Sequence, residues 1–425
     1  MNCEMNPKAI ILKKKSRSLK GTVRLPHSKS ISNRLLILRE LADGPFEISN
    51  LSEAEDTVLL ESLIAAINRK KGGQTLVELD CANAGTVMRF LTAWLSLVPG
   101  KWVMTGSERM KQRPIGTLVD GLNFLGAEID YLSQLGYPPV LIKGKALTGK
   151  MIVIDPGISS QFVSALLMIA PRIPGGLSIR MSGSAVSVPY VNMTIRLLEF
   201  FSVRVEQSKT SIQVYEGPVI PKDYTVEADW SAAASWYEMV ALSEKADLLL
   251  AGLKKESLQG DAVLAELYRH FGVETEFVEE GARLTKVKKE ILPFHFNFSD
   301  HPDIAQPVIT TCALLGCGGR FEGLSSLRIK ETDRLKALSD ELAKIGFGTE
   351  IVTDNPKSTG MILHEGQGKI TPGMVIPVYG DHRMAMSFAP LAMKFGEIGI
   401  ADPDVVRKSY PGYWEDLASN GFEIS

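Results

Sequence analysis

A repeated type of helix is the feature of this sequence that most constrains its fold. Each copy begins with a polar residue that can cap a helix and continues as a run that is apolar on every side. The six copies occupy residues 28–41, 83–97, 159–170, 229–242, 300–315 and 381–395. A helix that is apolar all round has to be buried. Because these helices start about 55 to 81 residues apart, we expect six repeating units to fill the chain.

A second set of six helices is amphipathic and alternates with the first. These helices occupy residues 57–68, 115–125, 191–201, 261–271, 331–345 and 413–420. Most end at a glycine, the residue that most readily supplies the left-handed conformation that closes a helix. The closing glycines are Gly126, Gly272, Gly346 and Gly421, and residues 201–203 are a variant without glycine. Each unit is therefore predicted to combine strands with one buried and one amphipathic helix.

The first unit is shorter than the others. Asp56, at the start of its amphipathic helix, is only 27 positions before Asn83, which opens the next buried helix. This interval leaves little chain for strands, so we expect the first unit to have lost some of them.

Length and composition place the chain among globular proteins of two or three domains. The chain has 425 residues, with 47 Lys and Arg against 49 Asp and Glu, and one core seldom organises so long a chain. Near-neutrality argues against a dedicated nucleic-acid binder, and no apolar run is long enough for a membrane span or a signal peptide. We therefore expect neither nucleic acid nor a membrane as a partner.

The cysteines and the common ligand motifs predict neither a metal nor a cofactor. Cys3, Cys81, Cys312 and Cys317 form no CxxC pair and no metal-ligand spacing with the six histidines. The sequence also lacks HExxH, an EF-hand loop, a P-loop and an early GxGxxG. We expect the cysteines to be small apolar side chains in a protein of the reducing cytoplasm.

Four of the buried helices begin with side chains that suit an anion. The free N–H groups and positive dipole end of a helix start already favour negative charge. The added side chains are Lys29, Ser30 and Arg34; Gly85 and Arg89; Ser159, Ser160 and Gln161; and Asp381, His382 and Arg383. Singly, such residues are more often ordinary caps or paired surface charges. Together they favour an anion site, because buried cations without a ligand would be costly.

Further cations and two carboxylates lie between these helices. The loop 109–114 and the segments 328–334 and 407–408 are rich in Lys and Arg, although a solvated charge run or intrahelical ion pairs would explain them too. We expect Lys330 and Arg334 to lie one helical turn apart. Asp303 and Glu331 are the carboxylates nearest these cations, which makes them candidates for a general base and a general acid.

Six motifs, taken together, resemble one known family. They are SKSISNR (28–34), NAGT (83–86) with Arg89, RPIG (113–116), SSQF (159–162), KETDR (330–334) and DHRMAM (381–386). In this order they are similar to the EPSP synthases, the 3-phosphoshikimate 1-carboxyvinyltransferases of the enolpyruvyl transferase family. The resemblance extends from about Val23 to Pro411.

The resemblance implies an α/β fold of two inside-out barrels, each with three βαβαββ units around buried parallel helices. One domain would comprise residues 1–27 and 227–425, including the first strand, and the other would comprise residues 28–226 with the shortened unit. It also implies two chain crossings between the domains and an active site in the cleft between them, which would close and exclude water.

The resemblance further implies a reaction in the shikimate pathway to chorismate and the aromatic amino acids. The enolpyruvyl group of phosphoenolpyruvate would pass to the 5-hydroxyl of shikimate 3-phosphate by addition and elimination through a tetrahedral intermediate, with release of phosphate. Both substrates are phosphorylated carboxylic acids, which explains a concentration of Lys and Arg. The resemblance implies no metal and no cofactor, and we expect a monomer.

Carried over position by position, the resemblance assigns a role to each matched residue. Asp303 would accept the hydroxyl proton, Glu331 would protonate the methylene carbon, and Lys29 would assist proton transfer and phosphate departure. Phosphoenolpyruvate would be bound by Lys29, Gly85, Arg113, Gln161, Arg334, Arg383 and Lys408. Shikimate 3-phosphate would be bound by Lys29, Ser30, Arg34, Ser159, Ser160, Gln161, Ser187, Tyr190, Asp303 and Lys330.

The chain departs from the family pattern at four positions. His27 replaces a usual Gly, Phe90 a usual Pro, Val188 a usual Lys, and Ser326 an Asn that often helps to hold the shikimate phosphate. Phe90 lies just beyond the Gly85 loop and so bears on binding of glyphosate, an inhibitor at the phosphoenolpyruvate site of this family.

Two other functions have to be weighed. The sister family that acts on UDP-N-acetylglucosamine shares the fold, but it usually has a Cys in the loop that matches 109–113 and Lys-Asn where this chain has Lys29-Ser30. A non-catalytic repeat protein could bind a polyanion through the same helix starts. Asp303 and Glu331 argue against that function, because carboxylates would weaken anion binding.

Overall fold

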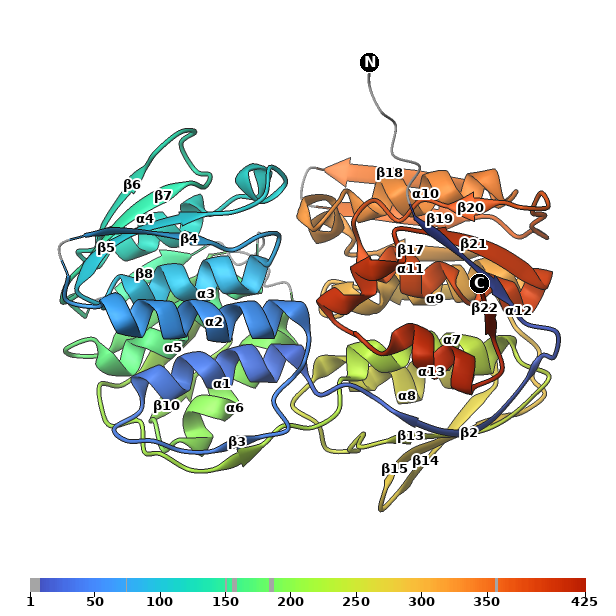
Figure 1. Cartoon of the computed structure of the whole chain (residues 1–425), viewed down its shortest axis with the longest axis horizontal. Helices are drawn as coiled ribbons and strands as arrows, with labels where there is room; N and C mark the ends of the chain where they lie inside the picture. Colours follow the sequence, from blue (N-terminus) through green and yellow to red (C-terminus); the bar gives the residue numbers. More distant parts are fainter. Residues whose placement is uncertain (1–7, 74, 150, 155–158, 183–186, 356–357) are drawn as a thin grey trace. The chain divides into compact units, whose positions relative to one another are not determined.

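The computed structural model describes residues 8–73, 75–149, 151–154, 159–182, 187–355 and 358–425 (Figure 1). By the contacts among its residues, the chain divides into two compact units. The N unit is Ser28–Val226, and the C unit is Glu227–Ser425 together with the chain up to His27. Each unit contains three repeats of the predicted α/β type.

Two repeats of the N unit have four strands each. The first contains β4 (Leu76–Asp80), α3 (Gly85–Leu95), β5 (Gly100–Thr105), α4 (Gly116–Phe124), β6 (Glu128–Tyr131) and β7 (Val140–Gly144). The second contains β8 (Met151–Ile154), α5 (Ser160–Ile169), β9 (Leu177–Met181), α6 (Val188–Phe200), β10 (Val205–Gln207) and β11 (Ser211–Val214). The strands on either side of the buried helix are parallel, and the last two strands form an antiparallel pair. This is the βαβαββ order.

The remaining repeat of the N unit is the shortened one. It contains α1 (Lys29–Leu41), β3 (Ile48–Ser49) and α2 (Glu55–Lys70). Its sheet consists of β3 paired in parallel with β12 (Tyr224–Thr225), from the far end of the unit. Each of the other five sheets has four strands. The expected loss of strands from the first unit is therefore confirmed for the described residues.

The C unit contains three four-stranded sheets. Its strands are β1 (Ala9–Lys13), β2 (Ser18–Arg24), β13 (Lys245–Ala251), β14 (Val273–Val278), β15 (Gly281–Lys286), β16 (Phe294–Asn297), β17 (Gly319–Glu322), β18 (Thr349–Asn355), β19 (Ser358–Leu363), β20 (Val375–Ile376), β21 (Glu397–Ala401) and β22 (Glu423–Ile424). Its helices are α7 (Trp230–Leu242), α8 (Leu264–Leu267), α9 (Ala305–Leu315), α10 (Arg334–Lys344), α11 (His382–Phe388), α12 (Leu391–Phe395) and α13 (Tyr413–Ser419).

The start of the chain supplies two strands to the C unit, where the sequence predicted one. β2 pairs in parallel with β13, whereas β1 pairs antiparallel with β21 and β22 in a different sheet. β2 thus takes the place of the first strand of one repeat, and β1 takes the place of the last strand of another. The connection between them is short, so this division could not be read from hydrophobic periodicity alone.

The six predicted buried helices form, with two corrections at prolines. The helix expected at 300–315 starts at Ala305, because Pro302 opens a 3-10 turn, Pro302–Ile304, ahead of it. The helix expected at 381–395 is divided into α11 and α12 at Pro390, which lacks the N–H group that a continuous helix would need there.

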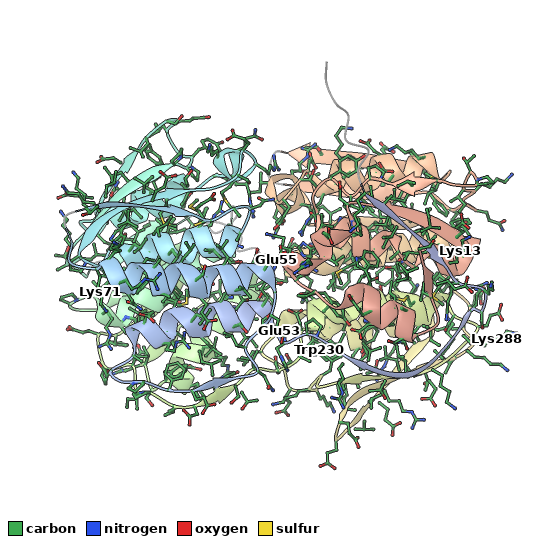
Figure 2. All side chains as sticks on the ribbon, in the orientation of Figure 1. Lys13, Glu53, Glu55, Lys71, Trp230 and Lys288 are labelled. Carbon is green, nitrogen blue, oxygen red and sulfur yellow. The ribbon has the colours of Figure 1, made fainter. Side chains whose placement is uncertain are left out.

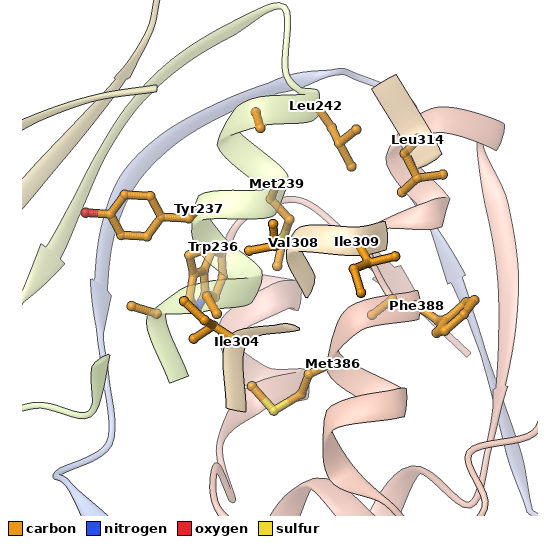
Figure 3. Packing of buried hydrophobic residues seen from close by; sticks show 14 of the residues in the cluster. Trp236, Tyr237, Met239, Leu242, Ile304, Val308, Ile309, Leu314, Met386 and Phe388 are labelled. Carbon is orange, nitrogen blue, oxygen red and sulfur yellow. The ribbon is translucent and has the colours of Figure 1, made fainter. Parts of the chain in front are cut away.

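The buried helices form the core of each unit. Helices α1, α3 and α5 pack against one another in the N unit, and α7, α9 and α11 do so in the C unit. Every residue of α7 except Ser231 is buried. Figure 3 shows side chains of α7 such as Trp236 and Met239 packed beside Val308 and Ile309 of α9. In contrast, charged side chains such as Lys71 and Lys288 are exposed (Figure 2).

Cations cap the carboxyl ends of several buried helices. Arg172 donates to the carbonyl of Leu41 at the end of α1, and Arg17 donates to that of Leu242 at the end of α7, at 2.7 Å. Lys394 donates to the last turn of α9. These charges satisfy orphan carbonyls and the negative dipole end. The helix starts, with their positive ends, are then available for other ligands.

The predicted helix stops are confirmed. All four glycines have positive φ, and Ser202 adopts the same conformation at 65° where the stop lacks glycine. Cys81, Cys312 and Cys317 are buried and free, whereas Cys3 lies outside the described residues. Over the described part of the chain, no helix combines the length and apolar character that crossing a membrane requires.

Candidate active site

The first turn of α1 carries a lysine whose direction is set by an acid. The Ser28 hydroxyl caps α1 by accepting from the Ile31 N–H. Lys29 Nζ lies 3.2 Å from Asp56 Oδ2 in the first turn of α2, and the exposed fractions of the two side chains are 16% and 7%. Asp56 was not among the predicted site residues. A carboxylate at the start of the neighbouring amphipathic helix is the signal that could have identified it.

Arg34 links three helices of the N unit. Its guanidinium donates to Thr194 Oγ1 at 2.7 Å, to Ser164 Oγ at 3.1 Å and to the carbonyl oxygens of Ser30 and Tyr190. Burial lowers the pKa of Arg34 to about 10, so it remains charged at neutral pH. The structure thus gathers three predicted residues, Arg34, Ser30 and Tyr190, around one buried charge. Ser164 and Thr194 were missed, although polar side chains inside apolar helices are a recognisable signal.

The basic loop, residues 109–114, contacts the start of α3. A Cβ atom on Gly85 would lie 2.4 Å from Arg113 Nη2, so only glycine lets this guanidinium pack against the backbone. Arg113 also donates to the carbonyl of Asn83 at 3.1 Å. Arg89 donates to the carbonyl of Pro114 at 2.8 Å and thereby ties the loop to α3. Phe90, one of the departures from the family pattern, lies under Arg34 instead, 5.3 Å from ring centre to guanidinium.

The starts of α5 and α6 complete the polar residues of the N unit. Ser159 caps α5 by accepting from the N–H of Gln161, whose side chain donates to Thr86 Oγ1 of α3 at 3.3 Å. Ser160 is buried beside them. Ser187 precedes α6 with φ 57° and ψ 39°, a left-handed conformation that is uncommon outside glycine and is found at functional sites.

Arg334 is the centre of the polar residues of the C unit. It donates to Asp381 Oδ2 at 2.6 Å, to Glu331 Oε2 at 2.9 Å and to Asp303 Oδ1 at 3.2 Å. The side chain is only 2% exposed. Burial alone would lower the pKa of Arg334, but the charges of these carboxylates outweigh burial and raise it. One guanidinium therefore holds both predicted acid–base residues and a third acid.

Asp303 lies among three cations. Arg383 Nη2 is 3.1 Å from Asp303 Oδ2, and Lys330 Nζ is 3.6 Å from Asp303 Oδ1. Burial would raise the pKa of Asp303, but Arg383, Lys330 and Arg334 together hold it well below the ordinary value of a carboxyl. Asp303 is therefore ionised at neutral pH, and it is a weak base as long as these cations are not neutralised.

Glu331 and Lys330 lie just before α10, not in it. Asp333 caps α10 by accepting from the N–H of Lys336, so the helix begins at Arg334. The expected spacing of Lys330 and Arg334 by one helical turn is therefore wrong, because Asp333 caps the start of α10 and Lys330 lies before this cap. Lys408 Nζ lies 3.9 Å from Glu331 Oε1, which brings the last predicted cation to this acid.

Asp381 is the acid that the sequence reasoning did not assign. It is fully buried, caps α11 through the N–H of Arg383 at 2.8 Å, and binds Arg334. Its position at the start of a buried helix predicted a cap but not an ion pair. Across the described residues, no group of three His, Cys, Asp or Glu side chains is placed to hold a metal ion.

The fold and these residues define a class of protein: a two-unit α/β repeat protein with polar and cationic side chains at the starts of its buried helices and carboxylates held among cations. A model of the family described as "EPSP synthase (3-phosphoshikimate 1-carboxyvinyltransferase)" matches residues 13–417. The chain belongs to this family.

Relatives and solved structures agree with this membership. A 3-phosphoshikimate 1-carboxyvinyltransferase of Bacteroides fragilis is 46% identical over 410 residues, which are 96% of each chain. One from Colwellia psychrerythraea is 33% identical over 94% of this chain and 96% of its own. A structure of EPSP synthase from Acinetobacter baumannii superposes with a TM-score of 0.77 at 23% identity, covering 98% of this chain and 99% of that one. The predicted fold class is thereby confirmed.

Proposed function

We propose that residues of both units carry out one reaction, the transfer of the enolpyruvyl group of phosphoenolpyruvate to the 5-hydroxyl of shikimate 3-phosphate. This is the activity of the family to which the chain belongs. The observation that carries the residue roles is the shared guanidinium of Arg334, which holds Asp303 and Glu331 among cations. A pure anion binder would gain nothing from two carboxylates placed there.

Each of the two substrates is bound by a set of cations and helix starts. Lys29, Arg113, Arg334, Arg383 and Lys408, with the backbone at Gly85 and the amide of Gln161, bind phosphoenolpyruvate. Ser30, Arg34, Ser159, Ser160, Gln161, Ser187, Tyr190 and Lys330, with Lys29 and Asp303, bind shikimate 3-phosphate. Each charge-assisted hydrogen bond contributes roughly 1.5–3 kcal/mol.

Asp303 and Glu331 transfer the protons of the addition step. Asp303 removes the proton of the 5-hydroxyl as its oxygen bonds to C2 of phosphoenolpyruvate, and Glu331 protonates the methylene carbon. The product is a tetrahedral ketal phosphate. Elimination then breaks the bond from C2 to the phosphate oxygen, and Glu331, which lost its proton in the addition step, takes a proton back from the new methyl group. Lys29 assists the departure of the phosphate, which takes up the hydroxyl proton held by Asp303.

Substrate binding raises the basicity of Asp303. The phosphate and carboxylate groups of the substrates bring negative charge to Lys330 and Arg383, the cations that hold the pKa of Asp303 low. Once these cations are neutralised, the pKa of Asp303 rises toward a value useful for proton removal. The base is thus strengthened only when substrate is present.

The assignment is tested with purified protein, both substrates and no added metal. We expect release of inorganic phosphate and a product with the mass of the enolpyruvyl ether. Turnover only with UDP-N-acetylglucosamine as acceptor would assign the protein to the sister activity, and no turnover with either acceptor would contradict the assignment.

The cellular setting and assembly are also proposals. We expect the protein to work in the reducing cytoplasm, where Cys81, Cys312 and Cys317 stay free thiols. We expect a monomer, which light scattering on the purified protein would establish. A larger mass would contradict this expectation.

A further inference from the structure

Two hydroxyl groups inside buried helix faces of the N unit contact the charge of Arg34. Ser164 of α5 and Thr194 of α6 are both fully buried. A hydroxyl inside a helix commonly donates to a carbonyl of the preceding turn of its own helix, as that of Thr92 in α3 does to Met88 at 2.7 Å. Ser164 and Thr194 differ from Thr92, because they also bind a side chain of a third helix, α1.

Both hydroxyl oxygens accept hydrogen bonds from the guanidinium. Arg34 Nε donates to Thr194 Oγ1 at 2.7 Å, and Arg34 Nη2 donates to Ser164 Oγ at 3.1 Å. Because arginine can only donate, each hydroxyl has to direct its own proton to another acceptor. The Thr194 hydroxyl donates to Ser164 Oγ at 3.0 Å, and the Ser164 hydroxyl donates to the carbonyl of Tyr190 at 3.4 Å. The network therefore fixes the direction of the planar guanidinium.

The groups around Arg34 orient its charge without neutralising it. In the described part of the chain, its other acceptors are the carbonyl oxygens of Ser30 at 2.8 Å and Tyr190 at 3.1 Å. The ring of Phe90 lies 5.3 Å from the guanidinium and attracts it without carrying a net charge. The Arg34 side chain is buried, with 3% of the residue exposed. A buried cation held by neutral groups keeps its charge for an anionic ligand.

We propose that Thr194 and Ser164 are positioning residues, whose neutral hydroxyls aim Arg34 at an anionic group of shikimate 3-phosphate and leave the full charge of the guanidinium for that group. This role rests on the proposed binding of shikimate 3-phosphate by Arg34. A carboxylate in place of either hydroxyl would also hold the guanidinium, but it would offset the charge that attracts the substrate. Neutral acceptors therefore suit a binding arginine at this position.

Thr194→Val tests the positioning role. Valine has nearly the shape of threonine but cannot accept from Arg34 Nε. We expect KM for shikimate 3-phosphate to rise about tenfold, while kcat and KM for phosphoenolpyruvate change little. Thr194→Ser, which keeps the hydroxyl, should have nearly the wild-type KM. A Thr194→Val variant with the wild-type KM for shikimate 3-phosphate would overturn the proposal.

Thr92→Val is the matched control for Thr194→Val. It makes the same change at another fully buried helix position of the N unit, where the hydroxyl bonds to Met88 of its own helix. All three kinetic constants should stay at their wild-type values. An equal rise of KM for shikimate 3-phosphate in both variants would assign the effect to a general loosening of the unit and would overturn the positioning role.

Thr194→Asp and Thr194→Asn separate the charge of Arg34 from its hydrogen bond. The two new side chains have the same shape and both offer an oxygen to the guanidinium, but only aspartate brings a negative charge. We expect the aspartate variant to bind shikimate 3-phosphate about tenfold more weakly than the asparagine variant. Calorimetric titration with shikimate 3-phosphate alone measures both affinities without turnover. Equal affinities would overturn the proposal.

Arg34→Gln distinguishes a failure of this proposal from a failure of the proposed binding role. It removes the charge itself, so KM for shikimate 3-phosphate should rise by more than it does in Thr194→Val. A wild-type KM in Arg34→Gln would overturn the role of Arg34 in binding. A raised KM in Arg34→Gln together with an unchanged KM in Thr194→Val would overturn only the positioning role.

Discussion

A single guanidinium holds the proposed acid–base residues of the C unit in place. Arg334 forms ion pairs with Asp303, Glu331 and Asp381 at once, and its N–H groups point in fixed directions because the guanidinium is planar. A lysine could not hold three carboxylates in this way. In the N unit, Asp56 orients Lys29 through an ion pair in the same way. Ion pairs thus orient the side chains to which we assign catalytic roles.

Lys29→Met tests whether the charge of Lys29 is needed for turnover. Methionine keeps most of the apolar part of the side chain but removes the charge, so we expect turnover to be abolished while the chain stays folded. Phosphate release measures turnover, and circular dichroism measures folding. Lys71→Met, at an exposed position of the same unit, serves as the control and should retain full activity. A Lys29→Met variant with wild-type turnover would refute the role given to Lys29.

The two ends of the buried helices carry different kinds of side chain. Cations occupy the carboxyl ends of α1, α7 and α9, where they satisfy carbonyl groups. The amino ends of α1, α3, α5 and α11 carry the predicted binding side chains. A helix dipole favours this division, because it attracts cations at one end and anions at the other. We therefore expect the same helices to provide stability at one end and binding at the other.

Arg172→Ala tests whether a cation at the carboxyl end of α1 stabilises the helix. It removes the bonds to the carbonyl of Leu41 that end α1, and we expect the free energy of unfolding to fall by about 1–2 kcal/mol. Denaturation by urea measures the change. Arg196→Ala is the matched control, since the Arg196 side chain is 70% exposed and its ion pair with Glu199 lies along its own helix; it should change stability little. Equal stability of the two variants would contradict the capping role.

At the scale of the whole molecule, the repeats are completed by strands from distant parts of the chain. β1 lies between β21 and β22, although almost the whole chain separates it from them. β12 completes the shortened first repeat in the same manner. The backbone of each incomplete sheet thereby gains the hydrogen bonds that its own repeat does not supply.

Leu12→Ala tests whether β1 stabilises the sheet that it completes. Leu12 is fully buried and pairs with Ile398 and Ile424. We expect a loss of about 2–4 kcal/mol in the free energy of unfolding, as for a core leucine, even though the residue is close to the chain start. Lys13→Ala, at a half-exposed neighbour on the same strand, removes only a surface ion pair with Glu397 and should have a small effect. A Leu12→Ala variant as stable as wild type would show that β1 does not close the sheet.

The sequence by itself determined the features that depend on neighbouring residues. Most of the buried and amphipathic helices, the caps at Ser28, Ser159, Asp229 and Asp381, and the glycine stops formed as predicted. The helix expected at 261–271 is instead two 3-10 turns on either side of the short α8, and α3 and α9 begin without the side-chain caps expected at Asn83 and Asp300. Periodicity and capping act within a few residues, so they can be read without knowing the fold. The motifs at the helix starts identified the family for the same reason.

Only the tertiary structure decided which of these residues meet. Arg34 binds residues of α5 and α6 more than 100 positions away, Arg334 binds Asp381 from a different repeat, and β1 and β2 separate into two sheets. Such contacts depend on packing and on long-range electrostatics, which no local pattern encodes.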